Sequence, residues 1–178
     1  MPTAAGQLLG YQLQLQRALV HLLQSGGGSS VSVEVTGDVA VMLGNGGKLE
    51  EEDKSSLRSN PVTNKSTDLW KTFYNWINAL NDGSIHHKET KFILYSNHEG
   101  NKGIVDALSD AQSFEDVNKC IGEVESLFES LETTHPIHSY LSHVLGHKDS
   151  FRDIVGSFEF IVGSKTGSEE IYQVLSDI

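Results

Sequence analysis

The fold is decided by residues 31–54, which read Val-Ser-Val-Glu-Val-Thr-Gly-Asp-Val-Ala-Val-Met-Leu-Gly-Asn-Gly-Gly-Lys-Leu-Glu-Glu-Glu-Asp-Lys. From residue 31 to residue 43, valines alternate with polar or small residues, which is the period-two pattern of a strand with one buried face. If this strand continues through Gly37, then Glu34 and Asp38 lie together on its polar face.

A hairpin turn and a returning strand are expected next. Residues 44–47, Gly-Asn-Gly-Gly, predict the turn, because glycine and asparagine tolerate the positive φ that tight hairpins need. The returning strand would span residues 48–55 and would contain four consecutive acids at 50–53. Its faces would separate Glu50, Glu52 and Lys54 from Leu49, Glu51 and Asp53. No apolar pattern explains the acids, so the segment is either a solvated loop or a strand that binds a cation.

Asp38, Glu52 and Lys54 carry the chemical hypothesis. An acid followed by an acid-x-lysine motif supplies the minimum set of groups that holds a hard divalent cation and makes water a nucleophile beside a phosphate. The spacing therefore favours a metal-dependent nuclease. The competing interpretation of the same residues is a charged sheet edge with a weak surface ion pair.

The rest of the chain predicts an α/β protein. Residues 7–24 place apolar side chains at helical spacing and predict a helix with one buried stripe. Ser66 is a candidate N-cap for a helix that runs to about Leu80, with Trp70 and Trp76 on its buried face. Later elements are predicted as a strand at 91–96, helices at 103–108, 114–131 and 138–145, a strand at 158–162 and a last helix at 169–178.

This α-β-β-β-α-β order, with Asp38 and Glu52-Asp53-Lys54, resembles the core of the PD-(D/E)xK nuclease superfamily. Further resemblance lies in Gly10-Tyr11-Gln12, Val33-Glu34, Gly37-Asp38-Val39, the segment Ser66-Thr67-Asp68-Leu69-Trp70-Lys71-Thr72 and Asn75-Trp76. These segments are similar to the N-terminal double-stranded-DNA endonuclease domains of bacterial anti-phage defence proteins, which are nucleotide-activated or ATPase-coupled effectors. The similarity is clearest from about residue 6 to about residue 80.

The resemblance implies a restriction-endonuclease-like core at about residues 6–100, with additional C-terminal helices at about 101–178. Both would form one nuclease domain over residues 1–178, as the N-terminal part of a longer protein.

The resemblance also implies the roles of the strand residues. Asp38 and Glu52 would coordinate Mg²⁺ or Mn²⁺ together with the backbone carbonyl of Asp53. Lys54 would position or deprotonate the attacking water, and Glu34 would support the metal or the lysine. Double-stranded DNA is the implied substrate, and hydrolysis of its phosphodiester bonds is the implied reaction.

Two supporting residues and one departure complete the resemblance. Gln12 matches the helix glutamine of the family, and it either orients a strand residue, touches phosphate or satisfies local backbone as a buried amide. Lys71 is a second supporting candidate, in the Leu-Trp-Lys-Thr segment. Many relatives have a more apolar strand, often with a glutamine, where this chain has four acids at 50–53. Extra acids there would displace the metal or reduce the affinity for DNA.

Composition limits the partners and the compartment. Twenty-four acidic against 13 basic residues leave a net charge of -11. This charge weighs against a nucleic-acid partner, unless local Lys and Arg residues or a partner protein hold the DNA. The single cysteine, Cys120, cannot form an internal disulfide, and no apolar run suggests a signal peptide or membrane helix, so we expect a cytoplasmic protein.

The charge also motivates an alternative to catalysis. In that alternative, the chain is a non-catalytic module with the same fold, which assembles with an ATPase or sensor partner. The family resemblance implies self-association or such a regulatory partner in either case.

Other chemistries have weaker support. His143 and His147 are one helical turn apart and could face one zinc ion, with His135 and His138 nearby. Without a nearby cysteine or a His-Glu-x-x-His motif, a solvated helix face is the simpler interpretation. A serine or cysteine hydrolase is excluded, because Cys120 lies in a predicted amphipathic helix and the sequence contains no Gly-x-Ser-x-Gly motif.

Overall fold

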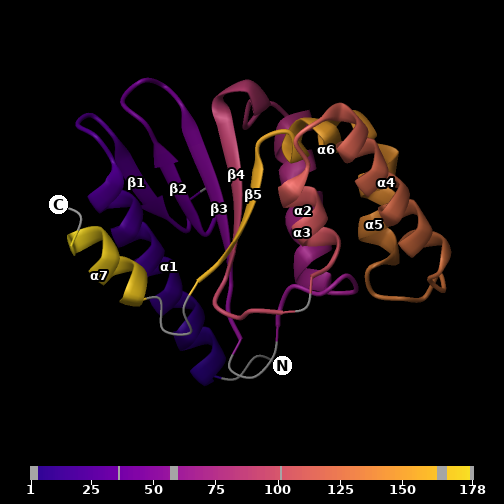
Figure 1. The fold of residues 1–178 in the computed structure, drawn as a ribbon, viewed down its shortest axis with the longest axis horizontal. Coiled ribbons are helices and arrows are strands. Elements are labelled where there is room, and N and C mark those ends of the chain that lie inside the picture. The colour runs from indigo at the N-terminus through magenta and orange to yellow at the C-terminus, as the bar shows by residue number, and fades with distance from the viewer. Residues whose placement is uncertain (1–3, 36, 57–59, 101, 164–167, 177–178) are drawn as a thin grey trace. The chain divides into compact units, whose positions relative to one another are not determined.

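The computed structural model describes residues 4–35, 37–56, 60–100, 102–163 and 168–176 (Figure 1). The protein has an α/β structure whose five-stranded mixed sheet runs in the order β1-β2-β3-β4-β5. The strands are β1 (Ser30–Val33), β2 (Val39–Met42), β3 (Lys48–Lys54), β4 (Thr90–Ser96) and β5 (Phe158–Val162). The helices are α1 (Ala4–Gln24), α2 (Thr67–Asn81), α3 (Ile104–Asp110), α4 (Phe114–Glu129), α5 (His138–Gly146), α6 (Lys148–Val155) and α7 (Ser168–Ser176), with a 3-10 turn η1 (His87–Glu89).

The chain forms two compact units. The first contains residues 1–61, 89–100 and 160–178, and the second contains residues 62–88 and 101–159. The first unit therefore holds α1, the strands β1 to β4 and α7, while the second holds α2 to α6.

The first two strands form a hairpin instead of one continuous strand. They pair antiparallel with Val33 opposite Val39, so the chain reverses between these residues. The condition of one strand through Gly37 does not hold, and the predicted order with separate strands for Glu34 and Asp38 does. An alternating pattern has the same appearance on two strands joined by a turn. Glu34 and Asp38 still meet, since they form the next pair beyond the valines. The backbone N–H of Glu34 donates to the carbonyl of Asp38 at 3.1 Å.

The second hairpin forms as predicted at residues 44–47. The Leu43 N–H donates to the Gly47 carbonyl at 2.8 Å, and Gly46 supplies the positive φ of 90° that the turn needs. β3 pairs antiparallel with β2 on one side and parallel with β4 on the other. The observed order of helix, three strands, helix and strand agrees with the predicted order.

The acidic run at 50–53 lies inside β3, a central strand, and the prediction of a solvated loop is wrong. Glu50 pairs with Lys48, Glu51 with Arg17, and Glu52 with Lys54. Three adjacent acids are tolerated in the sheet because each has a cation within ion-pair distance. The cations come from both ends of the strand and from a helix.

Helix α1 packs against the strands with its more polar side. It contacts β1, β2 and β3, and its buried residues are Leu13, Gln14, Arg17, Val20 and His21. Most of the predicted apolar stripe is on the other side. Leu9 and Leu23 are half-buried, but the other five predicted residues are exposed: Leu8, Tyr11, Leu15, Leu19 and Leu22. The prediction of a buried leucine stripe is therefore wrong. The reason is that β3 presents acidic side chains to the helix, and the side of α1 that carries Arg17 and His21 can pair with them.

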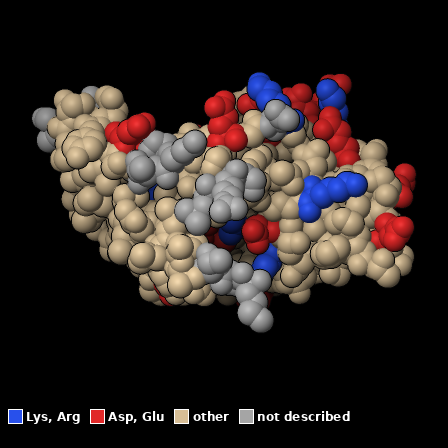
Figure 2. All heavy atoms as spheres, turned by 90° about the horizontal axis from the view of Figure 1, so that it is seen from below, with Lys and Arg blue, Asp and Glu red and all other residues tan. Residues whose placement is uncertain are grey.

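Figure 2 shows charged side chains gathered over part of the visible face, beside a broad surface with few of them.

The second unit is a helical unit with an aromatic core. The ring of Phe73 on α2 lies 5.2 Å from that of Phe151 on α6 and 5.7 Å from that of Trp76. Trp70 and Trp76 are both buried, as predicted, and Ser66 caps α2 by accepting a backbone N–H. The indoles therefore belong to the core of this unit.

Most later elements agree with the predicted ranges to within a few residues. The exception is α6, which follows α5 after the single residue His147 and was not predicted, because the break between the two helices contains no proline and only Gly146 as a turn signal. Within the described ranges, no helix combines the length and the apolar character needed to cross a bilayer.

Candidate active site

Asp38 lies at the centre of the candidate site, where the start of β2 meets the end of β3. Its Oδ2 accepts the backbone N–H of Asp53 at 2.8 Å, which ties the turn before β2 to the neighbouring strand. On β3, the Nζ of Lys54 donates to Oε2 of Glu52 at 2.7 Å. The charges of Glu52 and Lys54 both act on Asp38. The acid and the acid-x-lysine motif therefore meet in one place.

Gln14 connects this cluster to helix α1. Its amide Nε2 donates to Oε1 of Glu34 at 2.8 Å and to Oδ1 of Asp38 at 3.0 Å. The side-chain oxygen of Gln14 is also buried, and within the described part of the chain it has no hydrogen-bond partner. One amide thus holds the carboxylates of Glu34 and Asp38 together.

The turn that carries Glu34 and Asp38 has an unusual backbone. Glu34 has a φ of 57°, in the left-handed region that costs a non-glycine residue about 1 kcal/mol or more. Gly37 makes a close approach: a Cβ there would lie 2.9 Å from Oε2 of Glu50 and 3.8 Å from Oε1 of Glu52. Glycine therefore lets the turn lie directly against the carboxylates of β3.

Burial raises the pKa of Asp38 above its ordinary value, and the negative charge of Glu52 raises it further. The positive charge of Lys54 and the hydrogen bond from the Asp53 backbone act in the opposite direction. Burial and the neighbouring acid therefore both disfavour the charged form of Asp38, and a bound cation would favour it.

The opposite face of β3 carries a buried ion pair with α1. The guanidinium of Arg17 donates to both carboxylate oxygens of Glu51, at 2.7 and 2.8 Å, and Nε2 of His21 lies 2.8 Å from the same carboxylate. Burial alone would raise the pKa of Glu51, but the hydrogen bonds and charges of Arg17 and His21 outweigh it and lower the pKa to about 2. The guanidinium also lies 4.2 Å from the ring centre of Tyr95 on β4.

Asp53 is on the same face as this ion pair. Burial, followed by the charge of Glu51, raises the pKa of Asp53 well above its ordinary value. Its two carboxyl oxygens are buried and accept no hydrogen bond from the described residues. Burial and the neighbouring carboxylate of Glu51 thus both disfavour the charged form of Asp53. The backbone of Asp53 lies beside Asp38, to which its N–H donates.

The predicted site residues separate into two groups. Four are brought together by the first unit: Glu34, Asp38, Glu52 and Lys54. Gln12 and Lys71 are not part of this cluster as described, because Gln12 is exposed on α1 and Lys71 is exposed on α2, in the second unit. The glutamine that reaches the carboxylates is Gln14, two residues after Gln12.

The sequence reasoning did not identify Gln14, Arg17 or His21 as site neighbours. A signal for them exists, because they recur at intervals of three and four residues and form a polar stripe along a helix that is otherwise mainly apolar. A polar helical stripe beside a strand of acids predicts buried pairing between the two elements.

The donor atoms suit a hard cation. Asp38 and Glu52 supply carboxylate oxygens, and Mg²⁺ in proteins is typically held by one or two carboxylates while it keeps several waters. The backbone carbonyl of Asp53 is a further oxygen on the residue whose N–H donates to Asp38. No group of three or more His, Cys, Asp or Glu side chains within the described ranges is arranged to hold a metal ion. The fit therefore rests on two carboxylates with neutral oxygen donors.

The histidines of α5 do not form such a group either. The rings of His143 and His147 stack with their centres 4.3 Å apart, and His143 also packs against the ring of Tyr74 at 4.3 Å. His138 instead packs against Phe128. Within the described ranges, these histidines are not arranged as a group that could hold a metal ion.

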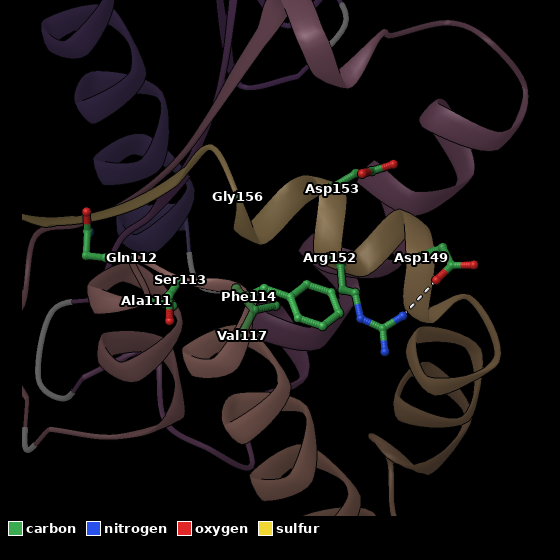
Figure 3. A pocket seen from close by; sticks show the side chains of 9 residues that line it. All are labelled: Ala111, Gln112, Ser113, Phe114, Val117, Asp149, Arg152, Asp153 and Gly156. Carbon is green, nitrogen blue, oxygen red and sulfur yellow. Dashed lines mark hydrogen bonds and ion pairs between the residues drawn. The ribbon is translucent and has the colours of Figure 1, made fainter.

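A pocket of about 560 Å³ lies in the second unit (Figure 3). Its lining residues are Ala111, Gln112, Ser113, Phe114, Val117, Asp149, Arg152, Asp153 and Gly156. Arg152 already donates to Asp149 at 2.7 Å, and its guanidinium lies 5.8 Å from the ring centre of Phe114. None of the predicted site residues lines this pocket.

In comparisons with protein-family models, curated proteins and solved structures, nothing matches this chain. The case for its function therefore rests on the residues and their geometry.

Proposed function

We propose that this protein is a metal-dependent endonuclease that hydrolyses phosphodiester bonds in double-stranded DNA. The single observation that carries the proposal is the meeting of Asp38, Glu52 and Lys54 on adjacent strands. The element order and the mixed sheet support the finer assignment to a restriction-endonuclease-like core. With the resemblance described above, this assignment points to a cytoplasmic defence effector.

The residues have distinct roles in this proposal. Asp38 and Glu52 would hold Mg²⁺ or Mn²⁺, together with the backbone carbonyl of Asp53. The bound cation lowers the pKa of a coordinated water and neutralises charge on the phosphate. Lys54 orients the attacking water or accepts its proton, and its ion pair with Glu52 keeps the amine beside the metal ligands. Gln14 positions Asp38 through the hydrogen bond at 3.0 Å.

The test is cleavage of a supercoiled plasmid and a linear duplex by the purified chain with Mg²⁺ or Mn²⁺. We expect Lys54→Ala and Asp38→Ala to reduce the rate by at least about a hundredfold, because each removes a group that acts directly on the reacting atoms. Lys91→Ala is the matched control, since it removes an exposed lysine from the adjacent strand β4. Cleavage that survives Lys54→Ala and Asp38→Ala after repurification would assign the activity to another site or to a contaminant.

A non-catalytic assembly module is the second candidate function. The observation that favours it is the pairing of Glu50, Glu51 and Glu52 with cationic side chains, which accounts for these acids without any chemistry. Calorimetric titration separates the two candidates. The nuclease requires Mg²⁺ or Mn²⁺ binding that Asp38→Ala and Glu52→Ala weaken, whereas the module requires none.

A further inference from the structure

Helix α1 exposes a continuous apolar face on the side away from the sheet. The exposed fractions are 69 % for Leu8, 58 % for Tyr11, 63 % for Leu15, 40 % for Leu19 and 57 % for Leu22. At 3.6 residues per turn, these five side chains lie within an arc of about 80°. An apolar stripe of this kind is normally buried against another element.

The spacing of the stripe is that of a helix pair. Leu8, Leu15 and Leu22 are seven residues apart, and Tyr11 and Ala18 each follow a leucine by three residues. These are the a and d positions of a heptad repeat, whose side chains interdigitate with the same positions of a second helix. From Leu8 to Leu22 the stripe is about 21 Å long at 1.5 Å per residue.

The apolar face of α1 carries no charge. Arg17 is the only Lys, Arg, Asp or Glu between Ala4 and Gln24, and it points to the other side of the helix, where it pairs with Glu51. Elsewhere the chain is strongly acidic, with a net charge of -11. Two copies of so acidic a protein repel each other over most of their surface. This repulsion is weakest where the uncharged faces of two α1 helices meet.

The neighbouring helix α7 also exposes apolar side chains. It packs beside α1 in the first unit (Figure 1). Tyr172 and Leu175 on α7 are 72 % and 53 % exposed.

We propose that α1 is the dimer interface of this protein, where it pairs with α1 of a second copy about a two-fold axis. A second copy is the occupant that the surface fits best, because a heptad seam without charges is complementary to itself. An acidic or basic partner helix would find no charged side chain on this face to pair with.

Molar mass in solution is the first test. We expect light scattering to give twice the chain mass of 19.5 kDa, with little change between low and high salt, because the seam is apolar. Leu15→Glu and Leu22→Glu should each raise the dissociation constant by about a hundredfold or more, since each puts a charge into the seam of both copies. Both leucines are exposed within one chain, so circular dichroism should show an unchanged fold. Phe114→Glu, at an exposed apolar residue of the second unit, should leave the dimer intact.

Cysteine cross-linking tests the geometry. In a parallel pair related by a two-fold axis, Leu15 faces Leu15 of the other copy, because both occupy the same heptad position. Leu15→Cys should therefore form a disulfide-linked dimer under mild oxidation. Leu8→Cys should cross-link only in a parallel pair, and the double variant Leu8→Cys/Leu22→Cys should also cross-link in an antiparallel pair. The parent chain is the control, because its only cysteine, Cys120, is buried.

A monomer at about 100 μM would overturn the proposal, as would a dimer that Leu15→Glu and Leu22→Glu leave unchanged. Neither measurement uses DNA or a metal ion, so the proposal can fail while the nuclease activity is found, and the reverse is also possible.

Discussion

At the scale of single residues, the most informative position is Glu34. Its φ of 57° is unfavourable for a side chain with a Cβ, and its carboxylate shares the amide of Gln14 with Asp38. Strain of this kind persists where the surrounding structure or the function requires it. A glycine at position 34 would relieve the strain and remove the carboxylate.

We therefore expect Glu34→Gly to reduce DNA cleavage without reducing the stability of the fold. The free energy of unfolding should stay the same or rise by up to about 1 kcal/mol, because the relief of strain offsets the lost hydrogen bond and the greater freedom of glycine. DNA cleavage should fall, because Asp38 loses a neighbour that shares its hydrogen-bond donor. Urea denaturation and a plasmid assay measure the two quantities. A large loss of stability would show that the carboxylate of Glu34 has mainly a structural role.

His143 gives the second prediction at this scale. Burial, followed by the charge of His147, lowers the pKa of His143 below its ordinary value of 6.5. The folded state then binds this proton less readily than the unfolded chain, so stability is lost as the pH falls below 6.5 toward the lowered value. We expect His143→Gln to lose less stability than the parent between about pH 7.5 and about pH 5.5. His86→Gln, in an exposed loop, should behave as the parent, and equal slopes for His143→Gln and the parent would refute the assignment.

At the scale of elements, β3 and α1 are held together by a buried ion pair. The side chains of Arg17 and Glu51 are 7 % and 0 % exposed, so neither charge is hydrated well. A buried pair of this kind is costly to break from one side, because the remaining charge stays buried without a partner. Replacing both members by apolar residues costs much less.

Glu51→Gln should therefore lower the free energy of unfolding by about 3–5 kcal/mol. The double variant Arg17→Met/Glu51→Leu should recover much of this loss, although His21 then loses its partner as well. Urea denaturation of the four members of the cycle gives the coupling energy directly. Glu99→Gln, at an exposed acid of the same unit, should change the stability by less than about 0.5 kcal/mol. A similar small effect for Glu51→Gln would contradict the buried pairing.

At the scale of the whole molecule, the net charge of -11 opposes the approach of DNA. The proposed function therefore needs a cation at Asp38 and Glu52 to reverse the local sign. Asp38→Asn/Glu52→Gln changes the net charge from -11 to -9 at this position alone. The variant should bind duplex DNA more tightly than the parent in EDTA, and salt should weaken this binding.

Fluorescence anisotropy with a labelled duplex measures this effect. The matched control is Glu99→Gln/Glu129→Gln, which removes the same amount of charge at two exposed positions. The control should bind DNA no better than the parent. Equal gains in the two variants would mean that DNA responds to the total charge of the protein and not to the candidate site.

The sequence by itself determined the local elements and the chemical groups. Valine alternation, the Gly-Asn-Gly-Gly turn and the Ser66 cap are local signals, because they depend on backbone geometry within a few residues. The acid and the acid-x-lysine motif could be named for the same reason, since residue type and strand parity are enough to place Glu52 and Lys54 on one face.

Only the tertiary structure decided which face of α1 is buried. An apolar stripe predicts burial, but it does not reveal that β3 offers Glu51 to the opposite side of the helix. Residues distant in the sequence determine which face is buried, because a buried carboxylate requires a cation at hydrogen-bond distance. Contacts between α1 and the strands also made Gln14 instead of Gln12 the neighbour of Asp38.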